Sequence, residues 1–403
     1  FRNHRFLGED HLVSREDIIS DNLDLQVRLG PLVGTGAGRT VVVLGNGPSL
    51  NKIDPSALRS VTTIGSNFIH LFDPSGEWLP SAVTCSNALV VEQGVDVFGS
   101  LPTPVLLPSY TRDVVGPEPN VRFVNINHDT DFSADVIDSA STYATVTYVN
   151  LQLAATLGFD RIVLTGFDHS YQQPSTGSHG AVIDQRGDDV NHFSKDYFRG
   201  KTWQKADTSE MGRMYAEAKR HLPRTSIVNA TVGGHLEIFP RVPLDDAIPA
   251  DERPLDLSRL AGPRRRPTRV VVSINPNAKA QVGHYIRFDQ RLRQALNRRE
   301  VGFVSLGSLD IEPTVEREHA WIIPTFGGTF TANHIGDQRV ADRMPDFDAE
   351  LSRGARLLRA VAPDTETTFF WYMGNLEYLD LVPDGGDHLL HLFFSYGYDL
   401  NNR

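Results

Sequence analysis

Three short stretches of the sequence combine residue types that could bind a nucleotide or move a proton. The first follows a run of branched apolar residues and reads Gly45-Asn46-Gly47-Pro48-Ser49. Two glycines let the backbone turn tightly and approach a ligand, and free N–H groups after the turn can face an anion. The lysine of a Walker A loop and the third glycine of a dinucleotide fingerprint are missing. The stretch therefore predicts either a ligand-binding turn or a purely structural one.

The other two stretches carry an acid and a histidine. Gly166-Phe167-Asp168 ends a second apolar run, which is where open α/β sheets bind ligands. Asp168 could hold ribose hydroxyls there, or could cap the next element. His192 lies among aromatic and polar residues at 191–198, and a neutral imidazole can accept a proton near pH 7. His192 is therefore a candidate general base, with a structural histidine packed on aromatic rings as the alternative.

The elements that must position these residues alternate along the chain. Uninterrupted runs of Val, Leu and Ile predict strands buried on both faces, at residues 40–44, 61–65, 81–85, 104–107, 121–124 and 161–166. An apolar helix is expected at residues 143–157, ending at Gly158. Strands that alternate with helices predict a doubly wound, mostly parallel α/β sheet.

The chain of 403 residues is long enough for two domains. Residues 1–246 are predicted to form the first domain. Residues 247–267 are rich in Pro, Arg, Asp and Gly, the composition of a linker. Residues 268–403 are predicted to form a second, smaller α/β domain, with strands at 268–274 and 301–306 and a helix at 284–298.

The composition of the chain limits which classes of binding partner and which cellular compartment are expected. The formal net charge is −11, from 39 basic and 50 acidic side chains, which argues against a nucleic-acid-binding surface. No apolar run reaches the ~18–20 residues that span a bilayer, so no transmembrane segment is predicted. Peripheral contact with a membrane and the oligomeric state stay open. The single cysteine, Cys85, allows neither an intrachain disulfide nor a CxxC zinc site and favours the cytoplasm.

The order and spacing of the motifs resemble the CMP-binding framework of the bacterial sialyltransferases of glycosyltransferase family forty-two. The same pattern marks the broader group of flagellin-modifying motility accessory factors and pterin-diphosphokinase-like proteins. The resemblance covers about residues 38–243 and rests on Asn46 in Gly-Asn-Gly-Pro-Ser-Leu, Asn67 in Ser-Asn-Phe, Asn87 in Cys-Ser-Asn and the Gly166-Phe167-Asp168 turn. It implies a Rossmann-like variant of the GT-A glycosyltransferase fold.

The resemblance also implies which residues bind the nucleotide and the donor sugar. Asn46 and Asn67 would contact the phosphate or the sugar, and Asn87 would bind the cytosine and ribose. Thr145 and Thr147 fall where that family begins a helix with Thr-Ser-Gly, so their hydroxyls could face the phosphate. The implied binding set is Gly45, Asn46, Gly47, Pro48, Ser49, Asn67, Asn87, Thr145, Thr147, Gly166, Phe167 and Asp168.

The catalytic group implied by the resemblance consists of His192, Tyr171 and Asp168. Asp168 corresponds to the acid of the family's Gly-Ile-Asp turn, and His192 falls near the catalytic histidine of the family. Tyr171 would be one of two tyrosines that stabilise the departing CMP phosphate. The second tyrosine has no match, and Tyr197 could take its place.

These roles imply inverting transfer from a CMP-activated nonulosonic or related keto-acid sugar to a glycan, glycolipid or protein, as in polysaccharide biosynthesis. No metal or other cofactor is then required, and the adjacent acids Asp188 and Asp189 are expected to be solvated. The main alternative is an ATP-dependent pterin-type diphosphokinase, which would need Mg²⁺ and carboxylates such as Asp168, Asp184 and Glu237. The third hypothesis is a module that binds a nucleotide and has no catalytic activity.

The predicted second domain resembles the first half of a two-lobed GT-B glycosyltransferase. The resemblance rests on Ser273-Ile274-Asn275-Pro276 and on residues 283–289. In that family the first half usually binds the acceptor, and the donor-binding lobe usually follows it.

Overall fold

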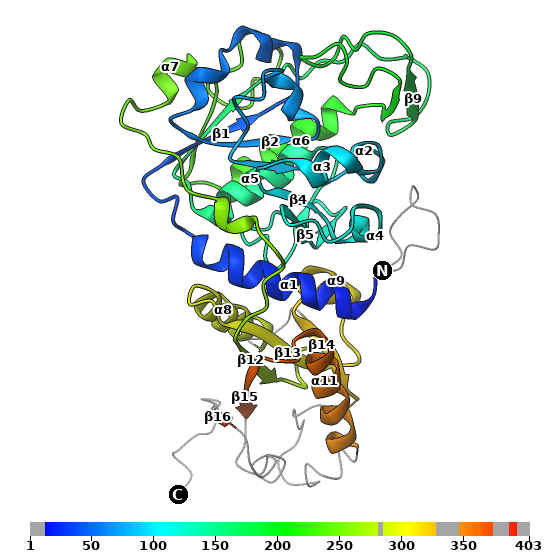
Figure 1. Cartoon of the computed structure of the whole chain (residues 1–403), viewed down its shortest axis with the longest axis vertical. Coiled ribbons are helices and arrows are strands. Elements are labelled where there is room, and N and C mark those ends of the chain that lie inside the picture. Colours follow the sequence, from blue (N-terminus) through cyan, green and yellow to red (C-terminus); the bar gives the residue numbers. More distant parts are fainter. Residues whose placement is uncertain (1–12, 281–284, 328–345, 374–386, 393–403) are drawn as a thin grey trace, which may run out of the picture. The chain divides into compact units, whose positions relative to one another are not determined.

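The computed structural model describes residues 13–280, 285–327, 346–373 and 387–392 of the chain (Figure 1). These residues divide into two compact units. The first unit contains Val13 and residues 32–264. The second unit contains residues 14–31 together with the described residues from Arg265 onward.

This division differs from the composition-based boundaries of 1–246, 247–267 and 268–403 in two places. Residues 14–31 group with the second unit, because the buried Gln26 amide pairs with the backbone of Phe303 (Nε2 to O, 2.8 Å; N to Oε1, 2.7 Å). The stretch after residue 247 packs on the first unit as far as residue 264. Glu252 Oε2 accepts a hydrogen bond from the Thr40 N–H (2.9 Å), and Leu260 is fully buried.

The first unit is built on a seven-stranded parallel sheet with the order β11-β8-β1-β2-β3-β4-β5. Its strands are β1 (Thr40–Leu44), β2 (Thr62–Ser66), β3 (Ala82–Thr84), β4 (Val105–Pro108), β5 (Val121–Val124), β8 (Arg161–Thr165) and β11 (Ser226–Asn229). The chain runs outward from β1 to β5 and then returns to β8 on the other side of β1. The sheet therefore has a topological switch point between β1 and β8, the place where such sheets bind ligands.

The remaining elements of the first unit surround this sheet. The helices are α2 (Ala88–Gln93), α3 (Val95–Ser100), α4 (Arg112–Val115), α5 (Val146–Leu157), α6 (Thr208–His221) and α7 (Leu244–Ala247). Short 3₁₀ turns are η2 (Pro48–Lys52), η3 (Pro55–Leu58), η4 (Ile69–Phe72), η5 (Ser109–Thr111) and η6 (Ser258–Leu260). Two small ribbons pair β6 (Ile126–Asn127) with β7 (Ala140–Ser141), and β9 (Val182–Gln185) with β10 (Lys201–Gln204).

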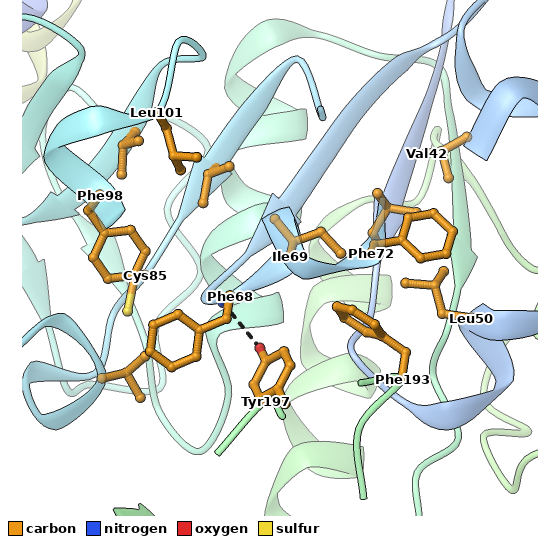
Figure 2. Packing of buried hydrophobic residues seen from close by; sticks show 14 of the residues in the cluster. Val42, Leu50, Phe68, Ile69, Phe72, Cys85, Phe98, Leu101, Phe193 and Tyr197 are labelled. Atoms are coloured by element: carbon orange, nitrogen blue, oxygen red, sulfur yellow. Dashed lines mark hydrogen bonds between the residues drawn. The ribbon is translucent and has the colours of Figure 1, made fainter. Parts of the chain in front are cut away.

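The apolar character of β1 follows from its position in the middle of the sheet. All five of its residues are buried. Val42 belongs to a core cluster that includes Phe72 and Phe193 (Figure 2). Val41 and Val43 alternate to the opposite face, and α5 packs against β1, β2 and β3. A strand covered on both faces needs an unbroken apolar run, which is the pattern that predicted it.

The second unit has its own five-stranded parallel sheet, with the order β14-β13-β12-β15-β16. Its strands are β12 (Arg269–Ile274), β13 (Gly302–Ser308), β14 (Ile322–Phe326), β15 (Glu366–Met373) and β16 (Asp387–Leu392). Its helices are α1 (Arg15–Leu29), α8 (Tyr285–Asn297), α9 (Pro313–Glu318) and α11 (Phe347–Val361). Two clusters of buried side chains, which include Trp371 and Trp321, form its core.

The prediction of a Rossmann-like doubly wound α/β fold with a second, smaller α/β unit is confirmed by these two parallel sheets. The predicted strands at 40–44 and 121–124 coincide with β1 and β5. The predicted helix end at Gly158 is also confirmed, with a left-handed φ of 81°. Residues 283 and 284, which belong to the GT-B-like motif, lie outside the described residues. None of the described helices is both long enough and apolar enough to cross a membrane.

Candidate functional site

The loops that follow β1 and β8 pack directly on each other at the switch point. Gly45 donates its N–H to Thr165 O (2.8 Å), and Gly47 donates to Gly166 O (2.9 Å). A Cβ on Gly45 would lie 2.7 Å from the carbonyl carbon of Gly166. Gly166 itself has φ of +80°, which side chains rarely allow. The glycines at 45 and 166 are therefore needed for the close approach of the two backbones.

Asp168 joins these two loops through its carboxylate. Its Oδ2 accepts hydrogen bonds from Ser49 Oγ (2.6 Å) and from the Ser49 N–H (3.2 Å). Pro48 starts the 3₁₀ turn η2, so Asp168 pairs with a free N–H in the first turn. Its own carbonyl accepts from the His235 N–H at 2.9 Å. Asp168 thus holds the shape of the turn from Gly45 to Ser49.

Buried polar atoms without a hydrogen-bond partner lie along the same carboxyl edge of the sheet. Asn46 Oδ1 follows β1, Asn67 Oδ1 follows β2, and Thr165 Oγ1 ends β8. Asn150 Nδ2, on α5, is also unpaired. A buried polar atom left unpaired costs about 1–3 kcal/mol, and a bound ligand or an ordered water would remove that cost. The edge around the switch point is therefore the candidate ligand site.

His192 is held at this edge by its neighbours in the chain. The Phe193 N–H donates to Asn46 O (3.0 Å), and Asn51 Nδ2 donates to Phe193 O (2.7 Å). The imidazole stacks on the ring of Tyr197, with centroids 4.1 Å apart and planes within 4°. The hydroxyl of Tyr197 accepts from the Phe68 N–H at 3.3 Å (Figure 2). These contacts link His192 to the loops after β1 and β2.

Asp189 is buried against His192, so the prediction that it is solvated was wrong. Only 2% of its side chain is exposed, and its Oδ2 lies 2.8 Å from His192 Nδ1. Burial opposes its ionisation, but His192 and the backbone N–H groups of Asn191 and Phe198 hold the pKa of Asp189 below its usual range. The neighbouring Asp188 is exposed and pairs with Arg199. The signal that sequence reasoning missed was an acid three residues before a histidine, because one tight turn can bring two side chains at this spacing into contact.

Tyr171 lies beside His192 but does not bond to it. The ring centroids of the two residues are 6.4 Å apart, in an edge-to-face arrangement, and Tyr171 also stacks on Trp203. Burial raises the pKa of the Tyr171 phenol, and the charges of nearby groups, Asp168 among them, add to the effect. The phenol is therefore neutral near pH 7 and can donate a hydrogen bond.

The start of α5 is connected to the loop after β8 through Tyr215 of α6. Thr145 caps the helix by accepting from the Thr147 N–H at 3.2 Å. Burial raises the pKa of the Tyr215 phenol, and the nearby hydroxyls of Thr145 and Thr147 oppose this shift. The Tyr215 ring meets the edge of Phe167 at 6.2 Å. The Phe167 N–H donates to Thr231 Oγ1 (3.0 Å). Sequence reasoning missed Tyr215, because nothing in α6 marks it as facing the site.

Asn87 follows β3 at the same edge, and both ends of its amide have partners within the protein. Its Oδ1 accepts from the Leu89 N–H (3.0 Å) and caps α2, while its Nδ2 donates to Gln204 Oε1 (2.7 Å). Contact of Asn87 with cytosine and ribose stays a prediction.

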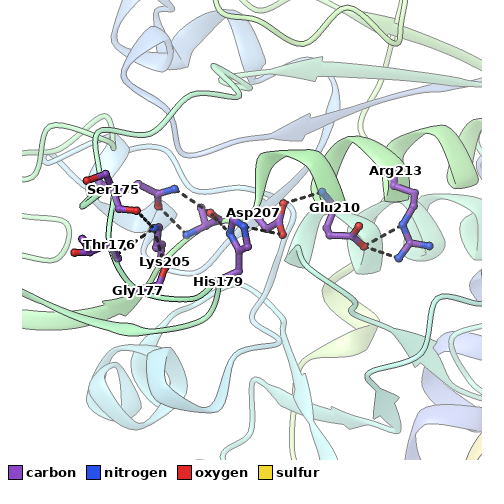
Figure 3. A network of polar contacts seen from close by, with 10 residues as sticks. Ser175, Thr176, Gly177, His179, Lys205, Asp207, Glu210 and Arg213 are labelled. Carbon is purple, nitrogen blue, oxygen red and sulfur yellow. Dashed lines mark hydrogen bonds and ion pairs between the residues drawn. The ribbon is translucent and has the colours of Figure 1, made fainter.

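The segment between Tyr171 and β9 is tied down by a network of polar contacts (Figure 3). Lys205 Nζ donates to the carbonyls of Ser175, Thr176 and Gly177 at 3.4, 3.3 and 3.0 Å. Asp207 accepts from the Glu210 N–H and caps α6. The segment that carries Tyr171 is thus tied to the residues just before α6.

The carboxylates considered for Mg²⁺ do not converge. Asp168 bonds to Ser49, Glu237 pairs with Arg241 at 2.7 Å, and Asp184 lies exposed on β9. Across the part of the chain that the structure describes, no three His, Cys, Asp or Glu side chains form a group that could hold a metal ion. The ligand set suggested for a diphosphokinase is therefore not assembled.

Neither a protein-family model nor a curated protein sequence matches the chain. Among solved structures, the MAf glycosyltransferase from Magnetospirillum magneticum AMB-1 is similar at 14% identity, with a TM-score of 0.37. The match covers 61% of this chain and 43% of that chain, less than half of its length. A superposition at this level carries no functional conclusion.

Proposed function

We propose that the first unit is a glycosyltransferase that moves a sugar from a nucleotide donor to a hydroxyl group, with His192 as the general base. The observation that supports this is the placement of the Asp189–His192 pair at the sheet edge that also holds the unpaired amide oxygens of Asn46 and Asn67. Amide oxygens accept hydrogen bonds, and the hydroxyls of a sugar or ribose donate them. A site that binds a sugar next to a general base is the arrangement needed to transfer that sugar to the hydroxyl group of an acceptor.

In the proposed step, the acceptor oxygen attacks the anomeric carbon on the face opposite the leaving phosphate. His192 Nε2 takes the proton of the acceptor hydroxyl. The bond from the anomeric carbon to the phosphate oxygen breaks, and its electron pair stays on the phosphate. The Tyr171 O–H and the helix start at Thr145 would stabilise that charge. A single displacement inverts the anomeric configuration.

The donor we propose is a CMP-activated nonulosonic or related keto-acid sugar, and the acceptor is a glycan, glycolipid or protein. This choice follows from the resemblance of the motifs around Asn46, Asn67 and Asn87 to sialyltransferase sequences. The proposed step uses no metal and no other cofactor.

Calorimetric titration of the whole chain with CMP, UDP, GDP and ATP, each with and without Mg²⁺, tests the proposal. CMP should bind in the presence of EDTA, and Asn46→Ala should weaken the binding of a CMP-sugar. His192→Gln should keep its affinity for CMP, and the rate of CMP release during transfer should fall by about 10²–10⁴-fold. Asp188→Asn, a change at an exposed neighbouring acid, is the control and should alter neither CMP affinity nor the rate of CMP release. Binding of ATP that needs Mg²⁺, with no response to CMP, would overturn the proposal in favour of the diphosphokinase.

A further inference from the structure

We propose that Asp189 is a positioning residue that keeps the proton of neutral His192 on Nδ1, which leaves Nε2 as the proton acceptor. This inference deepens the proposed function and rests on it for its role in catalysis. The tautomer that it assigns can nevertheless be measured without a substrate.

The hydrogen bond between Asp189 and His192 fixes which ring nitrogen carries the hydrogen. His192 Nδ1 lies 2.8 Å from Asp189 Oδ2. An ionised carboxylate only accepts hydrogen bonds, and the lowered pKa of Asp189 keeps it ionised. Nδ1 must therefore carry the hydrogen. Among the described residues no group bonds to Nε2 of His192, and 11% of the side chain is exposed.

The rings around His192 oppose the rotation that would exchange its two nitrogens. One face lies flat on Tyr197 at 4.1 Å, and Phe198 meets the ring edge-to-face at 5.2 Å. Asp189 is also held in place, since its Oδ1 accepts from the Asn191 N–H (2.9 Å) and its own N–H donates to Lys195 O (2.8 Å). Both members of the pair are thus fixed by the single turn from residue 189 to 198.

This arrangement has a consequence for proton transfer. When Nε2 takes the proton of the acceptor hydroxyl, the ring becomes a cation, and Nδ1 keeps its own proton. The buried Asp189 carboxylate stabilises that cation where little water is present to do so. In Asp189→Asn the amide can instead donate to Nδ1, which places the ring hydrogen on Nε2. A ring in that form cannot accept a proton at Nε2.

Long-range ¹H–¹⁵N spectra of protein with labelled histidine rings test the assignment directly. The signals of His192 are identified by their loss in His192→Gln. In the wild type we expect the Nδ1–H form, in Asp189→Asn a shift toward the Nε2–H form, and in Asp188→Asn no change. If the wild-type signals of His192 are dominated by the Nε2–H form, the inference is overturned, even where Asp189→Asn does not fold.

The transfer assay separates this inference from the proposed function. If the wild type transfers sugar, Asp189→Asn should lower kcat by about 10²-fold or more with little change in the KM of the donor. An unchanged kcat in Asp189→Asn would refute the positioning role. If the spectra show the expected tautomers and the wild type transfers no sugar, the proposed function fails and the assignment of the tautomer stands.

Discussion

Replacing Gly47 by alanine should break the contact that joins the loops after β1 and β8. A Cβ at this position would collide with Oδ2 of Asp168 and would lie 2.7 Å from its Cγ and 2.9 Å from Gly166 O. The backbone of Gly47 has φ of −74° and ψ of 161°, which alanine adopts freely. The cost is therefore steric, and the carboxylate must move away from the N–H and O–H of Ser49.

The size of the effect follows from the two hydrogen bonds that are lost. Hydrogen bonds to an ionised group contribute about 1.5–3 kcal/mol each. Asp168 is partly exposed, so water replaces part of the interaction and the lower value applies, about 3 kcal/mol for the pair. At ~2–4 °C per kcal/mol for a domain of this size, the first unit should unfold about 6–12 °C lower.

Hydrogen exchange followed by mass spectrometry during a temperature series reports the opening of the first unit separately from that of the second. Gly187→Ala is the matched control, because no atom lies within 4 Å of its Cβ position, and it should change stability by less than about 0.5 kcal/mol. In an Asp168→Ala background, where both hydrogen bonds are already absent, Gly47→Ala should cost about 3 kcal/mol less than in the wild type. If the costs of the two substitutions simply add, the reasoning is refuted.

Three further predictions concern other parts of the molecule. Burial raises the pKa of Asp289 from 3.8 to about 6, so the carboxyl group binds its proton more tightly in the folded state than in the unfolded state. The free energy of unfolding of the second unit should therefore fall by about 3 kcal/mol as the pH rises from 3.8 to about 6, and urea titrations of Asp289→Asn should lack this dependence. Gln26→Ala leaves the buried N–H and C=O of Phe303 unpaired. It should destabilise the second unit by about 2–5 kcal/mol, whereas faster hydrogen exchange in the first unit alone would contradict the assignment of α1. Burial raises the pKa of the Cys85 thiol to about 12, so a thiol reagent at pH 8 should react only as the first unit opens. Labelling at the rate of a free thiol would show that Cys85 is accessible.

The parts of the fold that could be predicted are those with a local cause. Strands covered on both faces need unbroken apolar runs, and Thr40–Leu44 and Arg161–Thr165 show them. Gly158 ends α5 because glycine accepts the left-handed conformation there. The assignment of residues 14–31 could not be predicted in this way, because a helix of mixed polar and apolar residues carries no sign of which core it will join.

The sequence by itself determined the alternation of strands and helices, the turns at Gly45–Ser49 and Gly166–Asp168, and the histidine among aromatic residues. Only the tertiary structure decided what each polar side chain meets. Asp168 bonds to Ser49, 119 residues away, because the strand order places β8 beside β1. Asp189 is buried because the chain from residue 189 to 195 folds back on it, so that His192, the Asn191 N–H and the Lys195 carbonyl all contact it. Local propensity acts over a few residues, whereas partners and burial depend on which distant elements the folded sheet brings together.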